Sequence, residues 1–146
     1  MEATLYRPNA GIIIFNKEGK LLWCKRKSGD GWQFPQGGID HGETPENAIY
    51  REAYEEVGLG KDKIKIIKEN EKWIKYDVPK EKIPRYFSFK NRKFKGRSQK
   101  WFLAQFLGQD KDIDLTVHNQ IEFTEWIWAS YWLSLIHISE PTRLIG

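Results

Sequence analysis

The sequence has little cysteine and no long apolar stretch, which excludes several classes of protein. Cys24 is the only cysteine among 146 residues, so an internal disulfide is excluded and a reducing compartment is favoured. No apolar run reaches the roughly 18 residues that a membrane-spanning helix requires. Residues 1–19 carry charges and one apolar run too short for a secretory signal. We therefore expect a cytoplasmic protein with no membrane association and no obligate protein partner.

Internal repeats are also absent, and the chain has the length of one domain with a substantial core. Apolar runs bounded by turn residues predict strands, and one segment of helical periodicity predicts a helix at about 45–57. The predicted strands are 11–16, 21–26, 63–68, 71–78, 99–107 and 122–129. Segment 79–98 is predicted to be a long loop, with a short strand as the alternative. Strands and one helix in mixed order indicate a layered α/β or α+β domain.

The net charge of +4 is unevenly distributed along the chain. Residues 37–59 contain six acidic residues and one basic residue, so the rest of the chain carries +9. Segment 80–100 holds nine basic residues against one acid, Glu81, with four aromatic residues interleaved. An acidic site beside a basic, aromatic surface suits a nucleic-acid substrate. The alternative is a solubilising basic loop whose aromatic residues simply pack.

Capping residues define the predicted helix. Thr44 is a suitable N-cap, Pro45 fits the first helical position, and Gly58 is the expected C-terminal stop. At about 100° per residue, the apolar residues share one face. This face consists of Ile49, Tyr50, Ala53, Tyr54 and Val57.

A second arc of the same helix carries Glu52, Glu55 and Glu56. Like charges three or four residues apart cost roughly 0.2–0.5 kcal/mol per pair without a counterion. A hard divalent cation, Mg²⁺ or Mn²⁺, removes this cost because it prefers carboxylate oxygen ligands. The alternative is a solvated acidic helix face that binds no ion.

Residues 37–59, GGIDHGETPENAIYREAYEEVGL, match a pattern of fixed identities. The pattern is G-x5-E-x7-R-E-U-x-E-E-x-G-U, where U is a bulky apolar residue, and Ala53 at the first U position is its one departure. Chance agreement at the fixed positions is on the order of 10⁻⁸ per start position. The segment resembles the Nudix box of metal-dependent hydrolases that cleave pyrophosphate bonds. This resemblance implies a mixed β-sheet sandwiched between helices.

The same resemblance assigns roles to the acidic residues. Glu55 and Glu56 would be metal ligands, and Glu52 would be a ligand or the base that takes a proton from water. We expect Glu52 to be the base. Glu43 and Arg51 would support catalysis as an ion pair that braces the loop against the helix.

Two glycines precede the helix. We expect Gly37 to lie at the metal site and Gly38 at the substrate. Both glycines would let the backbone approach the helix closely. The alternative is an ordinary tight turn.

Blocks outside the box resemble one subgroup, the bacterial RNA pyrophosphohydrolases and the related diadenosine tetraphosphate hydrolases. The blocks are 6–16, 32–40, 99–103 and 122–132. By this resemblance Glu122 completes the metal site from a neighbouring loop, which is the reading we favour; the alternative is that it is only a strand terminus. Arg7 would contact phosphates and Arg26 would lie near the 5′ nucleotides, because the guanidinium fork suits phosphate. The expected substrate-binding set is Arg7, Arg26, Gln36, Gly38 and Lys100.

The expected activity is hydrolysis of the 5′ triphosphate or diphosphate end of RNA to a 5′ monophosphate, as in RNA 5′-end processing and mRNA decay. A second reading is hydrolysis of dinucleoside polyphosphates by the same chemistry. A third reading is a nucleotide- or RNA-binding module with weak catalysis. The complete set of glutamates argues against this reading.

The C-terminal residues 133–146 differ in character from the rest. LSLIHISEPTR resembles a translated sequencing-adapter oligonucleotide, so we expect a domain at 1–132 followed by a foreign tail. Members of the family continue into a C-terminal helix, and we expect this chain to lack it.

Overall fold

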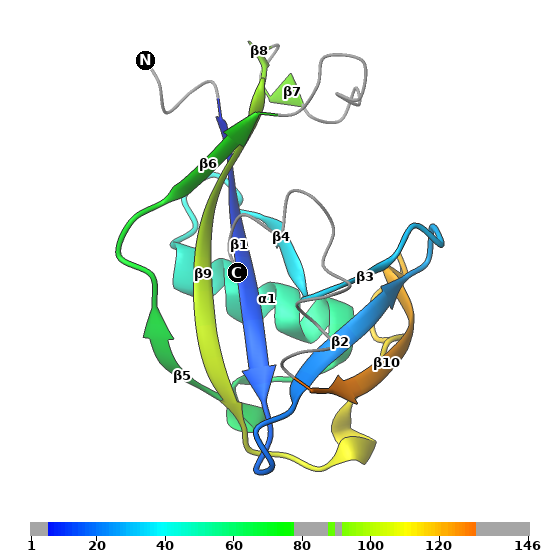
Figure 1. The fold of residues 1–146 in the computed structure, drawn as a ribbon. Helices are drawn as coiled ribbons and strands as arrows, with labels where there is room; N and C mark the ends of the chain where they lie inside the picture. The colour runs from blue at the N-terminus through cyan, green and yellow to red at the C-terminus, as the bar shows by residue number, and fades with distance from the viewer. Residues whose placement is uncertain (1–5, 78–87, 90–91, 131–146) are drawn as a thin grey trace.

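A computed structural model describes residues 6–77, 88–89 and 92–130. In chain order the strands and the α-helix are β1 (Tyr6–Phe15), β2 (Leu21–Arg26), β3 (Trp32–Gln33), β4 (Gln36–Gly38), α1 (Pro45–Val57), β5 (Ile64–Glu69), β6 (Ile74–Asp77), β7 (Ser88–Phe89), β8 (Arg92–Lys93), β9 (Gly96–Phe106) and β10 (Phe123–Ala129) (Figure 1). Two short 3₁₀-helices are η2 (Lys61–Lys63) and η5 (Asp110–Asp112).

A mixed sheet organises the described residues. Its strand order is β10-β2-β1-β9-β5, and the short strands β3, β4 and β6 pair with β2, β1 and β9. β1 and β9 are parallel, from Tyr6 opposite Gly96 to Phe15 opposite Gln105, and the other pairs of this sheet are antiparallel. These two long strands run side by side through the centre of the molecule (Figure 1). Apolar residues in the middle of both strands, among them Ile12 of β1 and Phe102 of β9, are buried in the core.

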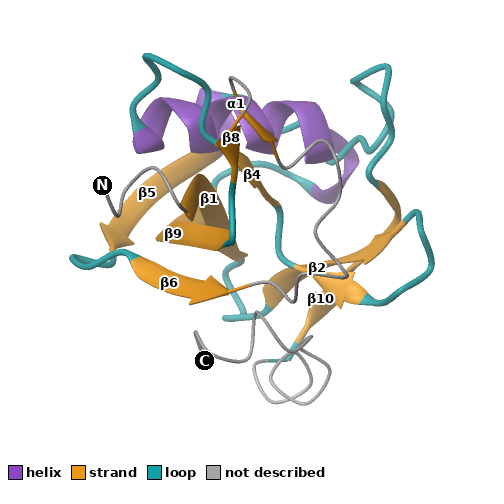
Figure 2. Ribbon diagram, turned by 90° about the horizontal axis from the view of Figure 1, so that it is seen from above, coloured by secondary structure: helices purple, strands orange, loops and turns teal. Residues whose placement is uncertain are grey.

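Different elements pack on the two faces of the sheet. Helix α1 lies across one face, where Ala53 packs with Ile12 and other buried residues of β1 and β9 (Figure 2). Successive residues of a strand point to opposite faces, so Trp101 belongs to the other face. There it packs in a second cluster with Trp23 and Phe34. The sheet therefore separates the helix from an aromatic cluster.

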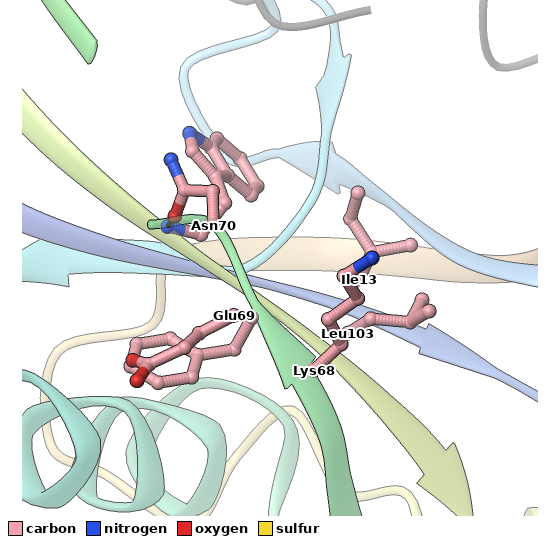
Figure 3. A pocket seen from close by; sticks show the side chains of 7 residues that line it. Ile13, Lys68, Glu69, Asn70 and Leu103 are labelled. Atoms are coloured by element: carbon pink, nitrogen blue, oxygen red, sulfur yellow. Dashed lines mark hydrogen bonds between the residues drawn. The ribbon is translucent and has the colours of Figure 1, made fainter. Parts of the chain in front are cut away.

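A cavity of about 210 Å³ lies beside β5 and β9 (Figure 3). Its lining residues are Ile13, Lys68, Glu69, Asn70, Trp101, Phe102 and Leu103. No residue predicted for the catalytic or metal site lines it. The chemistry expected from the sequence therefore lies elsewhere, at the end of α1 that meets β4.

The predicted elements agree with the structure where local signals define them. The helix at 45–57 and the strand at 21–26 are confirmed residue for residue. β1 and β9 begin earlier than predicted, at Tyr6 and Gly96, because each supplies hydrogen-bond partners for the other's first residues. β3 and β4 were not predicted, since each is a short strand that depends on pairing with a longer one.

The mixed α+β class is confirmed. Within the described residues one α-helix covers one face, so the expected sandwich between helices is seen on that side alone. The tail at 133–146, the expected lack of a C-terminal helix, and residues 80–87 and 90–91 of segment 80–100 lie outside the described residues. None of the helices in the described ranges has both the length and the apolar character needed to cross a membrane.

Candidate active site

The ends of α1 are fixed by the caps that the sequence predicts. Thr44 Oγ1 accepts a hydrogen bond from the Asn47 backbone N–H at 3.1 Å, which satisfies one of the free donors of the first turn. Gly58 adopts φ 75°, and its N–H bonds back to the last turn. Ala53 at the bulky-apolar position of the box is fully buried. The caps and this buried face set which arc of the helix faces β4.

Arg51 and Glu43 form the predicted brace between loop and helix. Arg51 Nε donates to Glu43 Oε2 at 2.7 Å and its Nη2 to Glu43 Oε1 at 2.9 Å, a two-pronged ion pair. Nη2 also donates to the Gly38 carbonyl at 2.9 Å. This pair lowers the pKa of Glu43 below its usual value, first through the hydrogen bond from Arg51. The loop before α1 is therefore fastened to the middle of the helix.

Gly37 meets Glu52 at close range. A Cβ placed on Gly37 would lie 2.2 Å from the Glu52 carboxyl carbon, so any larger residue would displace that carboxylate. Gly37 pairs with Ala10 of β1, which prevents the β4 backbone from moving aside freely. The requirement for glycine here thus follows from a close approach to the glutamate, as the sequence suggested.

Glu56 is the most deeply placed acid of the helix, with 6% of its surface exposed. Its Oε1 accepts a hydrogen bond from the Gln36 backbone N–H at 3.1 Å. One backbone donor compensates only part of the desolvation of a buried carboxylate. Burial is accordingly the first cause that raises the pKa of Glu56, followed by the charges of Glu52 and Glu122.

Glu52 is similarly perturbed. Burial raises its pKa to about 7, against the opposing effect of Arg51, and the charges of Glu55 and Glu122 raise it further. Glu122 precedes β10 and is exposed, yet its charge acts on both buried glutamates. The structure thus places Glu55 and Glu122 within electrostatic reach of Glu52 and Glu56.

These acids are suited to a hard cation by their chemistry. Four carboxylates of like charge, two of them largely desolvated, are the donor type that Mg²⁺ and Mn²⁺ prefer. Within residues 6–77, 88–89 and 92–130, no three such side chains already form a ready metal site. Arg51 Nη1 lies 2.7 Å from Glu52 Oε1 and 3.4 Å from Glu55 Oε2. A bound cation would compete with this guanidinium for those oxygens.

The predicted substrate residues occupy different surroundings. The Arg7 guanidinium lies against Gly38, 2.8 Å from where a Cβ would stand, and so adjoins the glycine pair. Arg26, at the end of β2, instead bonds to Asp30 at 3.0 Å and to Gln33 at 3.1 Å. The contacts of Lys100 are with the β5–β6 segment, including the Glu71 carbonyl at 3.4 Å. Direct contact of these side chains with substrate stays a prediction.

Sequence reasoning gave no role to Asn9, which is buried and polar in β1. Asn9 accepts a hydrogen bond from Gln99 of β9, and Gln99 also binds Gln36. The available signal was one amide residue in each of two predicted strand regions, Asn9 before the apolar run of β1 and Gln99 before that of β9. Recognising it requires the β1–β9 register, because the two residues are 90 positions apart.

Comparisons with known proteins show the family and the fold of this chain. The NUDIX domain family matches residues 5–142. An RNA pyrophosphohydrolase from Hydrogenovibrio crunogenus is 44% identical over 140 residues, which is 96% of this chain and 83% of the relative. One from Photorhabdus laumondii is 46% identical over 128 residues, covering 87% and 70%. One from Mannheimia succiniciproducens is 45% identical over 127 residues, so this chain spans only 63% of its length.

Solved structures share the fold at lower identity. An Ap4A hydrolase binary complex from C. elegans has a TM-score of 0.68 at 23% identity, covering 94% of this chain and 89% of that one. A dihydroneopterin triphosphate pyrophosphohydrolase from E. coli has a TM-score of 0.69 at 18% identity, covering 94% and 91%. At these identities the similarity establishes a common architecture.

Proposed function

This chain belongs to the Nudix family of hydrolases that act on pyrophosphate bonds, and we propose that it converts the 5′ triphosphate or diphosphate end of RNA to a 5′ monophosphate. Pyrophosphate or phosphate would be released. The observation that carries the proposal is the desolvated acid cluster of α1. It lies beside Gly37 and Gly38, where the absence of a Cβ leaves room for the Glu52 carboxylate and the Arg7 guanidinium. Its substrate class is suggested by relatives that bear the name RNA pyrophosphohydrolase.

Nudix hydrolases generally need divalent metal ions, and we assign that role here to Mg²⁺ or Mn²⁺. Glu55, Glu56 and Glu122 would hold the ion, with the Gly37 backbone beside it. When bound, the ion would neutralise charge on the phosphate oxygens and favour ionised glutamates. Arg51 Nη1 lies 3.4 Å from Glu55 Oε2, so the ion would compete with this guanidinium for that oxygen.

Glu52 is suited to act as the general base. A base works best when its pKa lies near the working pH, and burial gives Glu52 a pKa of about 7. Its carboxylate would take a proton from the attacking water, whose oxygen forms a bond to phosphorus. The phosphoanhydride bond then breaks and the leaving phosphate carries away the electron pair. Glu43 and Arg51 would keep α1 and the glycine loop in register during this step.

The phosphates would be oriented by positive charge near the glycines. Arg7 adjoins Gly38, and its guanidinium can bind a phosphate through two donors. Arg26 and Lys100 lie farther along β2 and β9, where their contacts are with protein groups. They would contact the RNA chain only after exchanging those partners. Cytoplasmic location and a domain boundary at residue 132 also belong to this proposal.

A parallel assay tests the proposed substrate. The protein is incubated with Mg²⁺ and either 5′-triphosphorylated RNA or diadenosine tetraphosphate, and kcat/KM is compared. Higher kcat/KM on RNA supports the proposal, and higher kcat/KM on the dinucleotide would favour the second reading. Binding of both substrates without turnover would indicate a binding module and contradict the proposal.

A further inference from the structure

A chain of amide side chains connects β9 to the strand that carries the glycine pair. Gln99, 1% exposed, donates from Nε2 to Asn9 Oδ1 at 3.1 Å and to Gln36 Oε1 at 2.8 Å. Its own Oε1 accepts a hydrogen bond from the indole Nε1 of Trp101 at 3.3 Å. The connected residues come from β1, β4 and β9, so one buried side chain joins three strands at their shared end.

The Trp101 indole sets the orientation of each amide in this hydrogen-bonded series. An amide can exchange its oxygen and nitrogen by rotating, but an indole N–H can only donate. Trp101 therefore holds the oxygen of Gln99 on its own side and leaves the nitrogen facing Gln36. Gln36 must then turn its oxygen towards Gln99, which follows from donor chemistry and not from an arbitrary choice of atoms.

As a result, the side-chain nitrogen of Gln36 points away from the buried amides of Gln99 and Asn9. Within the described part of the protein, Gln36 Nε2 has no hydrogen-bond partner. No buried side-chain nitrogen or oxygen there lacks a partner, so this nitrogen is at least partly exposed. The backbone N–H of the same residue binds Glu56 at 3.1 Å. Two free N–H donors therefore stand on a residue that also contacts the acid cluster.

We propose that Trp101 and Gln99 are positioning residues that hold the Gln36 amide with both N–H donors towards the substrate, where they bind an oxygen of the polyphosphate chain. The inference rests on the proposed function, because it concerns the same substrate. A phosphate oxygen accepts hydrogen bonds only, so the amide nitrogen attracts it and a rotated amide oxygen would repel it. Rotation of the Gln36 amide is opposed because it would set its NH2 group against the NH2 group of Gln99 and leave a buried N–H of Gln99 unpaired.

A double-mutant cycle tests this coupling. Trp101→Phe keeps a ring near Phe34 but removes the indole donor, and Gln99→Leu removes the amide that orients Gln36. Gln36→Met removes the acting amide at similar length. The measurements are KM and kcat on 5′-triphosphorylated RNA, and the Kd of a methylene-bridged, non-hydrolysable nucleoside triphosphate.

Gln99→Leu is expected to raise KM and Kd about three- to tenfold, the range set by restoring rotamer freedom to one long side chain. Trp101→Phe should raise them about twofold, as two amide orientations become similarly populated. kcat should stay within about twofold in both variants. In the Gln36→Met background neither substitution should change Kd further, because the group they position is gone.

Additive effects on Kd in the Gln36→Met background would overturn the inference, as would a fall in kcat with KM unchanged. Melting temperatures identify a variant that fails to fold. If Gln99→Leu fails to fold, the Trp101→Phe variant still tests the inference.

The Gln36 side-chain amide gives a second readout by ¹⁵N–¹H NMR. One signal pair is expected in the unaltered protein, and a second pair or exchange broadening in Trp101→Phe. The Kd cycle uses the analogue alone, so it decides the inference even if RNA is not the substrate.

Discussion

At the scale of single residues, Gly37 shows how a backbone atom can set the geometry of a carboxylate. The space that a side chain would take at this position is filled by the Glu52 carboxyl group, with all three of its atoms within 2.5 Å of the hypothetical Cβ. Glu52 is held on its other side by Arg51 at 2.7 Å. The proposed base therefore has little freedom to move.

Gly37→Ala should lower turnover by about 100-fold, because displacement of a catalytic group by roughly 1 Å has an effect of that order. Gly60→Ala is the matched control, since Gly60 has φ −76° and its added Cβ would meet only the end of Asp62. Steady-state rates with Mg²⁺ and melting temperatures check both. Wild-type turnover in folded Gly37→Ala would refute the close-approach argument.

At the scale of elements, helix α1 was predictable because its limits are local. Thr44, Pro45 and Gly58 act within one turn of where they stand, so the sequence alone defined residues 45–57. The glutamate arc followed from helical spacing. The same reasoning could not find β4 or the Asn9–Gln99 contact, because both depend on pairing with β1 across long separations in sequence. Nor could it give the depth of burial that raises the pKa of Glu52.

The N-cap of α1 offers a test at this scale. Thr44→Ala should lower the free energy of unfolding by about 1 kcal/mol, because the Asn47 N–H loses its partner. Thr44→Ser retains the hydroxyl and should remain close to wild type. Urea denaturation measures both. Equal destabilisation by alanine and serine would show that the hydroxyl cap contributes little.

At the scale of the whole molecule, the acid cluster couples folding to pH. The pKa of Glu52 is about 7 in the folded protein against an ordinary 4.5. Below pH 4.5 the group is protonated in both states and has no effect on stability. Between pH 4.5 and about 7 the unfolded chain releases the proton first, so stability falls as pH rises, and above pH 7 the full cost remains.

Metal-free protein should therefore lose stability between pH 5 and pH 8, by at most about 3 kcal/mol from Glu52. Glu56 acts in the same direction. Glu43 has a lowered pKa, so its stabilising effect is lost only as pH falls below this window. Mg²⁺ should restore stability at pH 8 by binding the folded state. Urea denaturation at pH 5 and pH 8 measures this change, and Glu52→Gln is the control that should lose part of it. A metal-free protein at least as stable at pH 8 as at pH 5 would contradict the prediction.

Charge distribution gives a second whole-molecule prediction. Outside residues 37–59 the chain carries +9, and nine of its basic residues lie in segment 80–100. Affinity for RNA should fall steeply between about 50 and 200 mM salt through counterion release. Filter binding with the Glu52→Gln variant avoids turnover during the assay. An affinity independent of salt would remove this segment from substrate binding.

The central claim, that the buried carboxylates of α1 act on a phosphoanhydride bond, is tested most directly by turnover of 5′-triphosphorylated RNA with Mg²⁺ in the unaltered protein and in Glu52→Gln. The account predicts 5′-monophosphorylated RNA from the former. It predicts a rate at least about 100-fold lower from a folded Glu52→Gln variant, the usual effect of losing a general base. An undiminished rate in that variant would contradict the account.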